Sequence, residues 1–87
     1  MIFNQHLGRS DESIEIRHDN SGNCTVAFIK DGEVFVYPTV NDFVLDNYFG
    51  TQVERTYIRE EHLEKAYAQA PYDYYEFKKW VLENIQI

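Results

Sequence analysis

Cys24 and His18 are the two side chains in this sequence that come nearest to a nucleophile and its base. Cys24 is the single cysteine, and His18 precedes it across a short turn-like segment. Nucleophilic catalysis also needs a group that orients the base. A lone cysteine that begins an apolar segment is usually a small core side chain. We therefore predict that Cys24 has no catalytic role and that the chain is not an enzyme.

Metal and phosphate sites have equally little support in the sequence. The three histidines are scattered, and none of them pairs at the i,i+3 or i,i+4 spacing that is frequent in zinc sites. The glycines stand singly in turn-like positions, so no glycine-rich phosphate loop is present. We predict no metal and no cofactor. The residues considered are His6, His18, His62, Gly8, Gly22, Gly32 and Gly50.

Carboxylates are the most abundant chemical groups, with 15 Asp and Glu against 8 Lys and Arg and a net charge of −7. The pairs Asp42/Asp46 and Glu60/Glu64 have the i,i+4 spacing of one solvated helix face. General acid catalysis needs a desolvated carboxyl, so this placement argues against it. So much negative charge repels phosphate, which argues against direct nucleic-acid binding. It is complementary to a basic protein surface. The alternative is that the acidity only maintains solubility.

Strands are expected first along the chain. Residues 13–18 alternate apolar and polar side chains, which is typical of a strand with one wet face. Asp31-Gly32 separates two apolar runs, 24–30 and 33–37, and is a strong hairpin signal because both turn residues need positive φ. The hairpin has apolar side chains on both faces. We expect both faces to be covered, or one of them to be partly used as an interface.

Helices are expected later, near residues 41–49, 57–70 and 73–85. Asn41 and Asp73 are the predicted N-caps of the first and third helices, and Gly50 ends the first. Residues 51–56 form a fourth strand or an extended link, and Ile2-Phe3 enters the core or pairs at a sheet edge. The fold class is α+β, with a three-stranded antiparallel sheet, or a four-stranded one if residues 51–56 pair. The three helices would cover one face of the sheet.

The size and composition bound the class of protein. With 87 residues and 44% hydrophobic side chains, the chain is one domain with one core. No secretory signal begins the sequence, and no run approaches the roughly 20 apolar residues needed to cross a bilayer. A single cysteine suits a reducing compartment. We expect a cytoplasmic protein without membrane contact.

The candidate partner-binding residues combine acids with aromatics, because tyrosine provides large contact areas at interfaces and acids favour a basic partner. If the first two helices pack side by side, their acids form one negative surface with Phe43 near its middle. The candidates are Asp42, Phe43, Asp46, Glu54, Glu60, Glu61, Glu64, Tyr72 and Tyr75.

By its size, acidity, strand-first layout and acid- and tyrosine-rich helices, the chain resembles small phage-encoded inhibitors of host defence, including anti-CRISPR proteins and DNA-mimic inhibitors. That class shares no motif, so no residue role is transferred. The resemblance implies a stoichiometric inhibitor that occupies the basic nucleic-acid site of a nucleic-acid-processing enzyme. Acidic immunity proteins that neutralise nuclease toxins have the same features. A structural homodimer, which would use the apolar stripe of Tyr75 and Leu82, is the remaining alternative.

Overall fold

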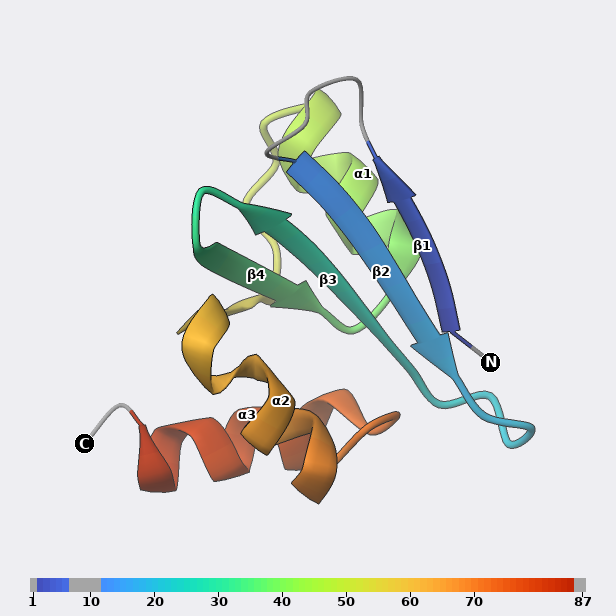
Figure 1. Ribbon diagram of the computed structural model, residues 1–87. Coiled ribbons are helices and arrows are strands. Elements are labelled where there is room, and N and C mark those ends of the chain that lie inside the picture. The colour runs from blue at the N-terminus through green and yellow to red at the C-terminus, as the bar shows by residue number, and fades with distance from the viewer. Residues whose placement is uncertain (1, 7–11, 86–87) are drawn as a thin grey trace.

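The computed structural model describes residues 2–6 and 12–85, which form an antiparallel sheet and three helices (Figure 1). The sheet has the strand order β1-β2-β3-β4-β5, and the predicted α+β class is confirmed. The strands are β1 (Ile2–His6), β2 (Glu12–His18), β3 (Cys24–Lys30), β4 (Glu33–Tyr37) and β5 (Thr56–Arg59). The helices are α1 (Val40–Tyr48), α2 (Glu60–Gln69) and α3 (Tyr74–Asn84).

The hairpin formed by β3 and β4 is the one that Asp31-Gly32 predicts. Both turn residues have positive φ, 52° at Asp31 and 81° at Gly32. The register places Phe28 opposite Phe35, as the two-residue turn requires. This turn chemistry therefore fixes which side chains of the hairpin share a face.

The sheet gains a strand at each edge relative to its predicted three-stranded core. β1 pairs with β2, so the expectation that Ile2-Phe3 pairs at an edge is confirmed. β5 pairs with β4 and begins at Thr56, the last residue of the 51–56 segment. The predicted helix start at Tyr57 is wrong, because Ile58 lies opposite Val34 and is only 1% exposed. Burial within the sheet outweighs the helical pattern there, and α2 starts at Glu60.

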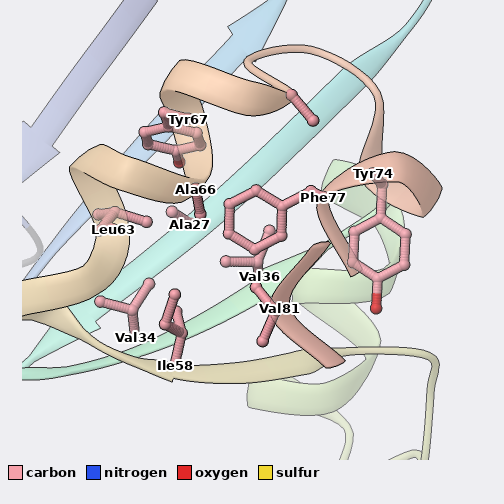
Figure 2. Packing of buried hydrophobic residues seen from close by; sticks show 11 residues of the cluster. Ala27, Val34, Val36, Ile58, Leu63, Ala66, Tyr67, Tyr74, Phe77 and Val81 are labelled. Atoms are coloured by element: carbon pink, nitrogen blue, oxygen red, sulfur yellow. The ribbon is translucent and has the colours of Figure 1, made fainter. Parts of the chain in front are cut away.

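Helices cover both faces of the sheet, which corrects the expectation that they share one face. α1 inserts Phe43 against Ile14, Val26 and Tyr37 on one side. On the other side, α2 and α3 pack on alternate residues of the same strands, including Ala27 and Val36 (Figure 2). Two apolar faces on one hairpin require two covering layers, so the expectation that both faces are covered is confirmed.

Short polar side chains cap the starts of α1 and α3. Thr39, and not the predicted Asn41, caps α1, and its Oγ1 accepts a hydrogen bond from the Asp42 N–H at 3.0 Å. Asp73 caps α3 as predicted, and its Oδ1 accepts hydrogen bonds from the N–H groups of Tyr75 and Glu76 at 3.1 and 3.2 Å. Gly50, with φ of 66°, follows the end of α1 as predicted. Both capped starts lie at the same end of the sheet, where β3 begins and β4 ends.

Candidate functional site

The single acidic surface expected from α1 and α2 does not exist. α1 packs on one face of the sheet and α2 on the other, so Asp42 and Asp46 are separated by the sheet from Glu60, Glu61 and Glu64. The expectation failed because it assumed that all helices lie on one face. The nine candidate residues therefore divide among several places on the molecule.

Phe43 is a core residue, so its predicted exposure is wrong. Its side chain is 5% exposed, and its ring meets those of Phe28 and Tyr37 edge to face at centroid distances of 5.5 and 5.7 Å. The predicted inner residues Tyr48 and Phe49 are 68% and 71% exposed instead. The large ring of Phe43 fills the space above the sheet, which determines how α1 is rotated.

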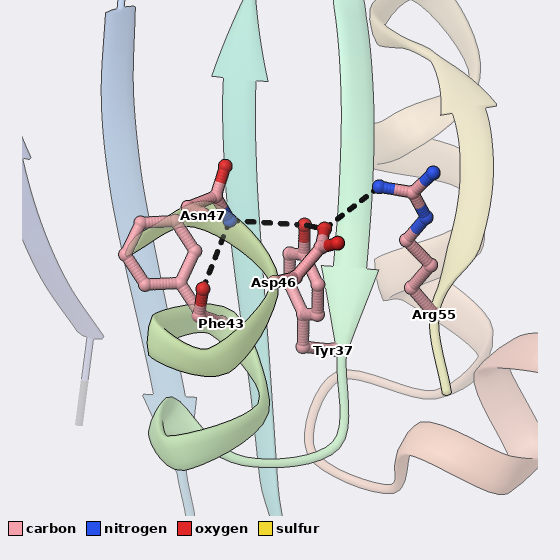
Figure 3. Close-up of polar contacts among 5 residues, drawn as sticks. All are labelled: Tyr37, Phe43, Asp46, Asn47 and Arg55. Carbon is pink, nitrogen blue, oxygen red and sulfur yellow. Dashed lines mark hydrogen bonds and ion pairs between the residues drawn. The ribbon is translucent and has the colours of Figure 1, made fainter. Parts of the chain in front are cut away.

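Asp46 is a half-buried structural side chain and not a free surface acid (Figure 3). Its Oδ2 accepts hydrogen bonds from the Tyr37 hydroxyl at 2.6 Å and from Arg55 Nη1 at 2.7 Å. Asn47 Nδ2 donates to the Tyr37 hydroxyl oxygen at 3.1 Å. Burial, together with the hydrogen bond to Asp46, raises the pKa of Tyr37. Asp46 thus joins α1 to β4 and to the segment before β5.

Glu54 is also engaged within the molecule. Its Oε2 accepts hydrogen bonds from Lys78 Nζ at 2.8 Å and from the Tyr74 hydroxyl at 2.9 Å. The hydrogen bond from Lys78 is the main cause that lowers the pKa of Glu54, and the bond from Tyr74 adds to it. Tyr74 shares a further hydrogen bond of 2.8 Å with Thr56 Oγ1, and burial raises its pKa. Glu54 therefore anchors the start of α3 to the link before β5.

The acids of α2 are exposed as predicted. Glu61 Oε1 lies 3.9 Å from Arg59 Nε and 3.7 Å from His62 Nε2. Glu60 and Glu64 line a shallow hollow of about 340 Å³ beside Glu15 and Arg17 of β2. Neither Glu60 nor Glu64 forms an ion pair within the described ranges.

Three of the predicted residues come together in one cleft at the end of the sheet. Asp42, Tyr72 and Tyr75 line a hollow of about 280 Å³ where the start of α1 meets the segment that leads into α3. Tyr75 is 64% exposed, and its ring meets that of Tyr74 edge to face at 5.1 Å. We call this hollow the acid–tyrosine cleft. The residues that complete its lining are Gly22, Asn23, Cys24, Pro38, Thr39, Asp73 and Tyr74.

The electrostatics of the acid–tyrosine cleft favour a cation. Two helix starts would normally attract an anion through their free N–H groups. Here Thr39 and Asp73 accept hydrogen bonds from first-turn N–H groups, and Asp42 and Asp73 add two negative charges. Neither carboxylate forms an ion pair with any residue that the structure describes. The tyrosine faces provide π surfaces on which a guanidinium or ammonium group can rest.

Asp73 is not among the nine candidate residues, because its position at a helix start assigns it first to the cap of α3. Asp42 and Asp73 are far apart along the chain, and only the packing of α1 and α3 on opposite faces brings both to the same end of the sheet. The local clue was the Tyr72–Tyr75 segment, in which tyrosines surround an acid at a helix start. That clue marks one wall of the cleft and gives no information on the other.

Cys24 also lines the cleft, without signs of activation. The β2–β3 register places His18 opposite Cys24, yet burial alone shifts the pKa of the thiol, and it raises it. A nucleophilic cysteine needs a shift in the other direction. In the part of the chain that the structure describes, no three His, Cys, Asp or Glu side chains come close enough to hold a metal ion.

No family model, curated protein or solved structure matches this chain. Within residues 2–6 and 12–85, no helix has the length and apolar character needed to span a bilayer.

Proposed function

We propose that this protein is a non-enzymatic binding protein that uses the acid–tyrosine cleft to hold a basic segment of a partner protein. The proposed partner is a nucleic-acid-processing enzyme whose phosphate-binding site carries arginine or lysine side chains. By occupying that site, the protein acts as a stoichiometric inhibitor of the anti-CRISPR or similar counter-defence type, and it works in the cytoplasm. It contacts neither nucleic acid nor membrane directly.

The observation that carries this proposal is that tyrosines and two carboxylates meet at one exposed cleft. Asp42 accepts a hydrogen bond from the Thr39 hydroxyl and Asp73 caps α3, but neither carboxylate forms an ion pair with a described residue. Elsewhere on the described surface, most basic side chains lie close to acids and neutralise them. The ion-paired bases are Arg17, Lys30, Arg55, Arg59 and Lys78. No described Lys or Arg lines the cleft beside Asp42 and Asp73. A partner's cation placed there gains attraction from both carboxylates and contact with Tyr75.

A photo-crosslinking experiment tests the proposed function and identifies the partner. Position 75 receives a photoreactive phenylalanine analogue in place of Tyr75, in the cells where the protein is made. The matched control places the same analogue at Tyr48, a tyrosine of similar exposure, 68% against 64%, that lies outside the cleft. We expect position 75, and not position 48, to capture one basic nucleic-acid-binding protein. Capture of an acidic protein, or equal capture at both positions, contradicts the proposal.

A homodimer without inhibitory role is the second candidate, supported by one exposed stripe. Tyr75 and Leu82 lie on the outer side of α3, at 64% and 48% exposure. Crosslinking of position 75 to a second copy of the chain, together with a dimer mass in sedimentation, would favour this candidate over the first.

A further inference from the structure

Two consecutive residues, Glu54 and Arg55, connect the helical layers that lie on opposite faces of the sheet. Glu54 accepts hydrogen bonds from Lys78 Nζ and from the Tyr74 hydroxyl, both in α3. Arg55 donates to Asp46 Oδ2 of α1 at 2.7 Å. Because the two side chains are adjacent in the chain and bind opposite layers, a single peptide unit joins the two layers beside the sheet edge.

Each arm of this connection is held by more than one contact. On the α1 side, the Arg55 guanidinium lies 4.7 Å from the centre of the Phe35 ring. Asp46 also accepts a hydrogen bond from the Tyr37 hydroxyl (Figure 3). On the α3 side, Tyr74 binds Glu54 and also Thr56, the first residue of β5. Charge-assisted hydrogen bonds are short and directional, so each arm restricts the position of its helix.

The same two helices supply the walls of the acid–tyrosine cleft. On α1, Asp42 lies one helical turn before Asp46. On α3, Tyr74 lines the cleft, and its hydroxyl donates a hydrogen bond to Glu54. A movement of either helix relative to the sheet therefore changes the separation between Asp42 and the tyrosines.

We propose that Glu54 and Arg55 form a clamp that fixes the spacing of α1 and α3 and thereby the width of the cleft between their starts. The functional meaning of this clamp rests on the proposed function, whereas the spacing is a property of the free protein. A cation that touches both walls stabilises the clamped arrangement. The coupling is reciprocal. The factor by which a bound cation favours the clamped arrangement is also the factor by which loss of the clamp weakens binding of that cation.

The spacing can be measured by pulsed electron paramagnetic resonance on protein without any ligand. Nitroxide labels at Asn41 in α1 and Lys79 in α3, both exposed, report the separation of the helices in a Cys24→Ala background. The clamp variant is Glu54→Gln/Arg55→Gln. The matched control is Glu61→Gln/Arg59→Gln, which removes the same two charges from an exposed pair at 3.9 Å within the β5–α2 segment.

We expect the clamp variant to broaden the distribution of spin–spin distances and shift it to longer values, while the control keeps the wild-type distribution. Circular dichroism verifies that the variants are folded. If the double variant unfolds, Arg55→Lys and Glu54→Gln are compared singly, and Glu54→Gln is expected to give the broader distribution because Arg55→Lys keeps the charge beside Asp46. A folded clamp variant with the wild-type distribution, single variants that both retain it, or a control that broadens equally would overturn the clamp. Failure to capture a basic partner would contradict the proposed function alone.

Discussion

Phe43 points into the core, whereas the sequence predicts it on the outer side of the first helix. Replacing it therefore tests how α1 is oriented on the sheet. Phe43→Ala removes a side chain that is 5% exposed and that packs against Phe28 and Tyr37. Removing a buried phenylalanine costs both its transfer free energy and the cavity left behind, about 3–5 kcal/mol. A domain of this size is stabilised by about 5–15 kcal/mol. The variant should therefore lose at least about one fifth of the domain's stability and, at the low end of that stability range, unfold at room temperature.

The matched control is Phe49→Ala, since Phe49 lies at the end of the same helix and is 71% exposed. Its replacement should change the free energy of unfolding by no more than about 0.5 kcal/mol. Phe43→Leu, which keeps part of the contact, should cost about 1–2 kcal/mol and remain measurable if the alanine variant does not fold. Urea titration followed by the fluorescence of Trp80 provides the free energies. A larger loss for Phe49→Ala than for Phe43→Ala would refute the placement of α1.

Three further predictions concern the polar contacts and the thiol. Tyr74→Phe removes the hydroxyl shared by Glu54 and Thr56 and should lower the free energy of unfolding by about 1–3 kcal/mol in urea titration; an unchanged value would contradict these bonds. Because the folded state lowers the pKa of Glu54, its contribution is present above its ordinary pKa and is lost as the pH falls through the lower folded value. Glu54→Gln should therefore flatten the acid side of a plot of stability against pH, and an identical slope in both proteins would oppose that assignment. Because burial raises the pKa of Cys24, iodoacetamide should alkylate it more slowly than a free thiol at neutral pH, and Cys24→Ala should leave partner binding intact with a loss of no more than about 1–2 kcal/mol of stability. Rapid alkylation, or loss of binding in folded Cys24→Ala, would show that the thiol is functional.

Local turn and capping signals predicted much of the fold. Asp31-Gly32 predicted the β3–β4 hairpin and its register, because few residue pairs adopt two positive φ values. Asp73 predicted the start of α3 for a similarly local reason. Short-range chemistry was thus sufficient for the hairpin and for the start of α3, but not for the cap of α1, which is Thr39 and not Asn41.

The failures arose where distant parts of the chain determine the result. Apolar residues surround much of α1, so helical periodicity cannot decide between the Phe43 side and the Tyr48 side. Contact with β2 and β3 decides it. Likewise, Ile58 becomes part of a strand because β4 offers an edge, although its neighbours in sequence favour a helix.

The sequence predicted several residues of the candidate site, but not where on the molecule they come together. Asp42 was a candidate as an acid of the first helix, and Tyr72 and Tyr75 as aromatics at the start of the third. The structure brings all three into one cleft with Asp73. Asp46 and Glu54 were interpreted as acids that are available to a partner, whereas each accepts short hydrogen bonds within the molecule, although Glu54 is exposed. Residue type shows which groups can bind a cation, and only the packing shows which of them are still available to one.

The affinity of the crosslinked partner for cleft variants tests the central claim most directly. Asp42→Asn/Asp73→Ser removes both carboxylates while serine still caps α3, and Glu60→Gln/Glu64→Gln removes the same charge from α2. Exposed charge pairs contribute about 0.2–1 kcal/mol each, so the cleft variant should bind roughly 2- to 30-fold more weakly at low salt, with a smaller difference as salt rises. The α2 variant should retain nearly wild-type affinity. Equal affinity of the folded cleft variant and the wild type at both salt concentrations would contradict the acid–tyrosine cleft as the binding site.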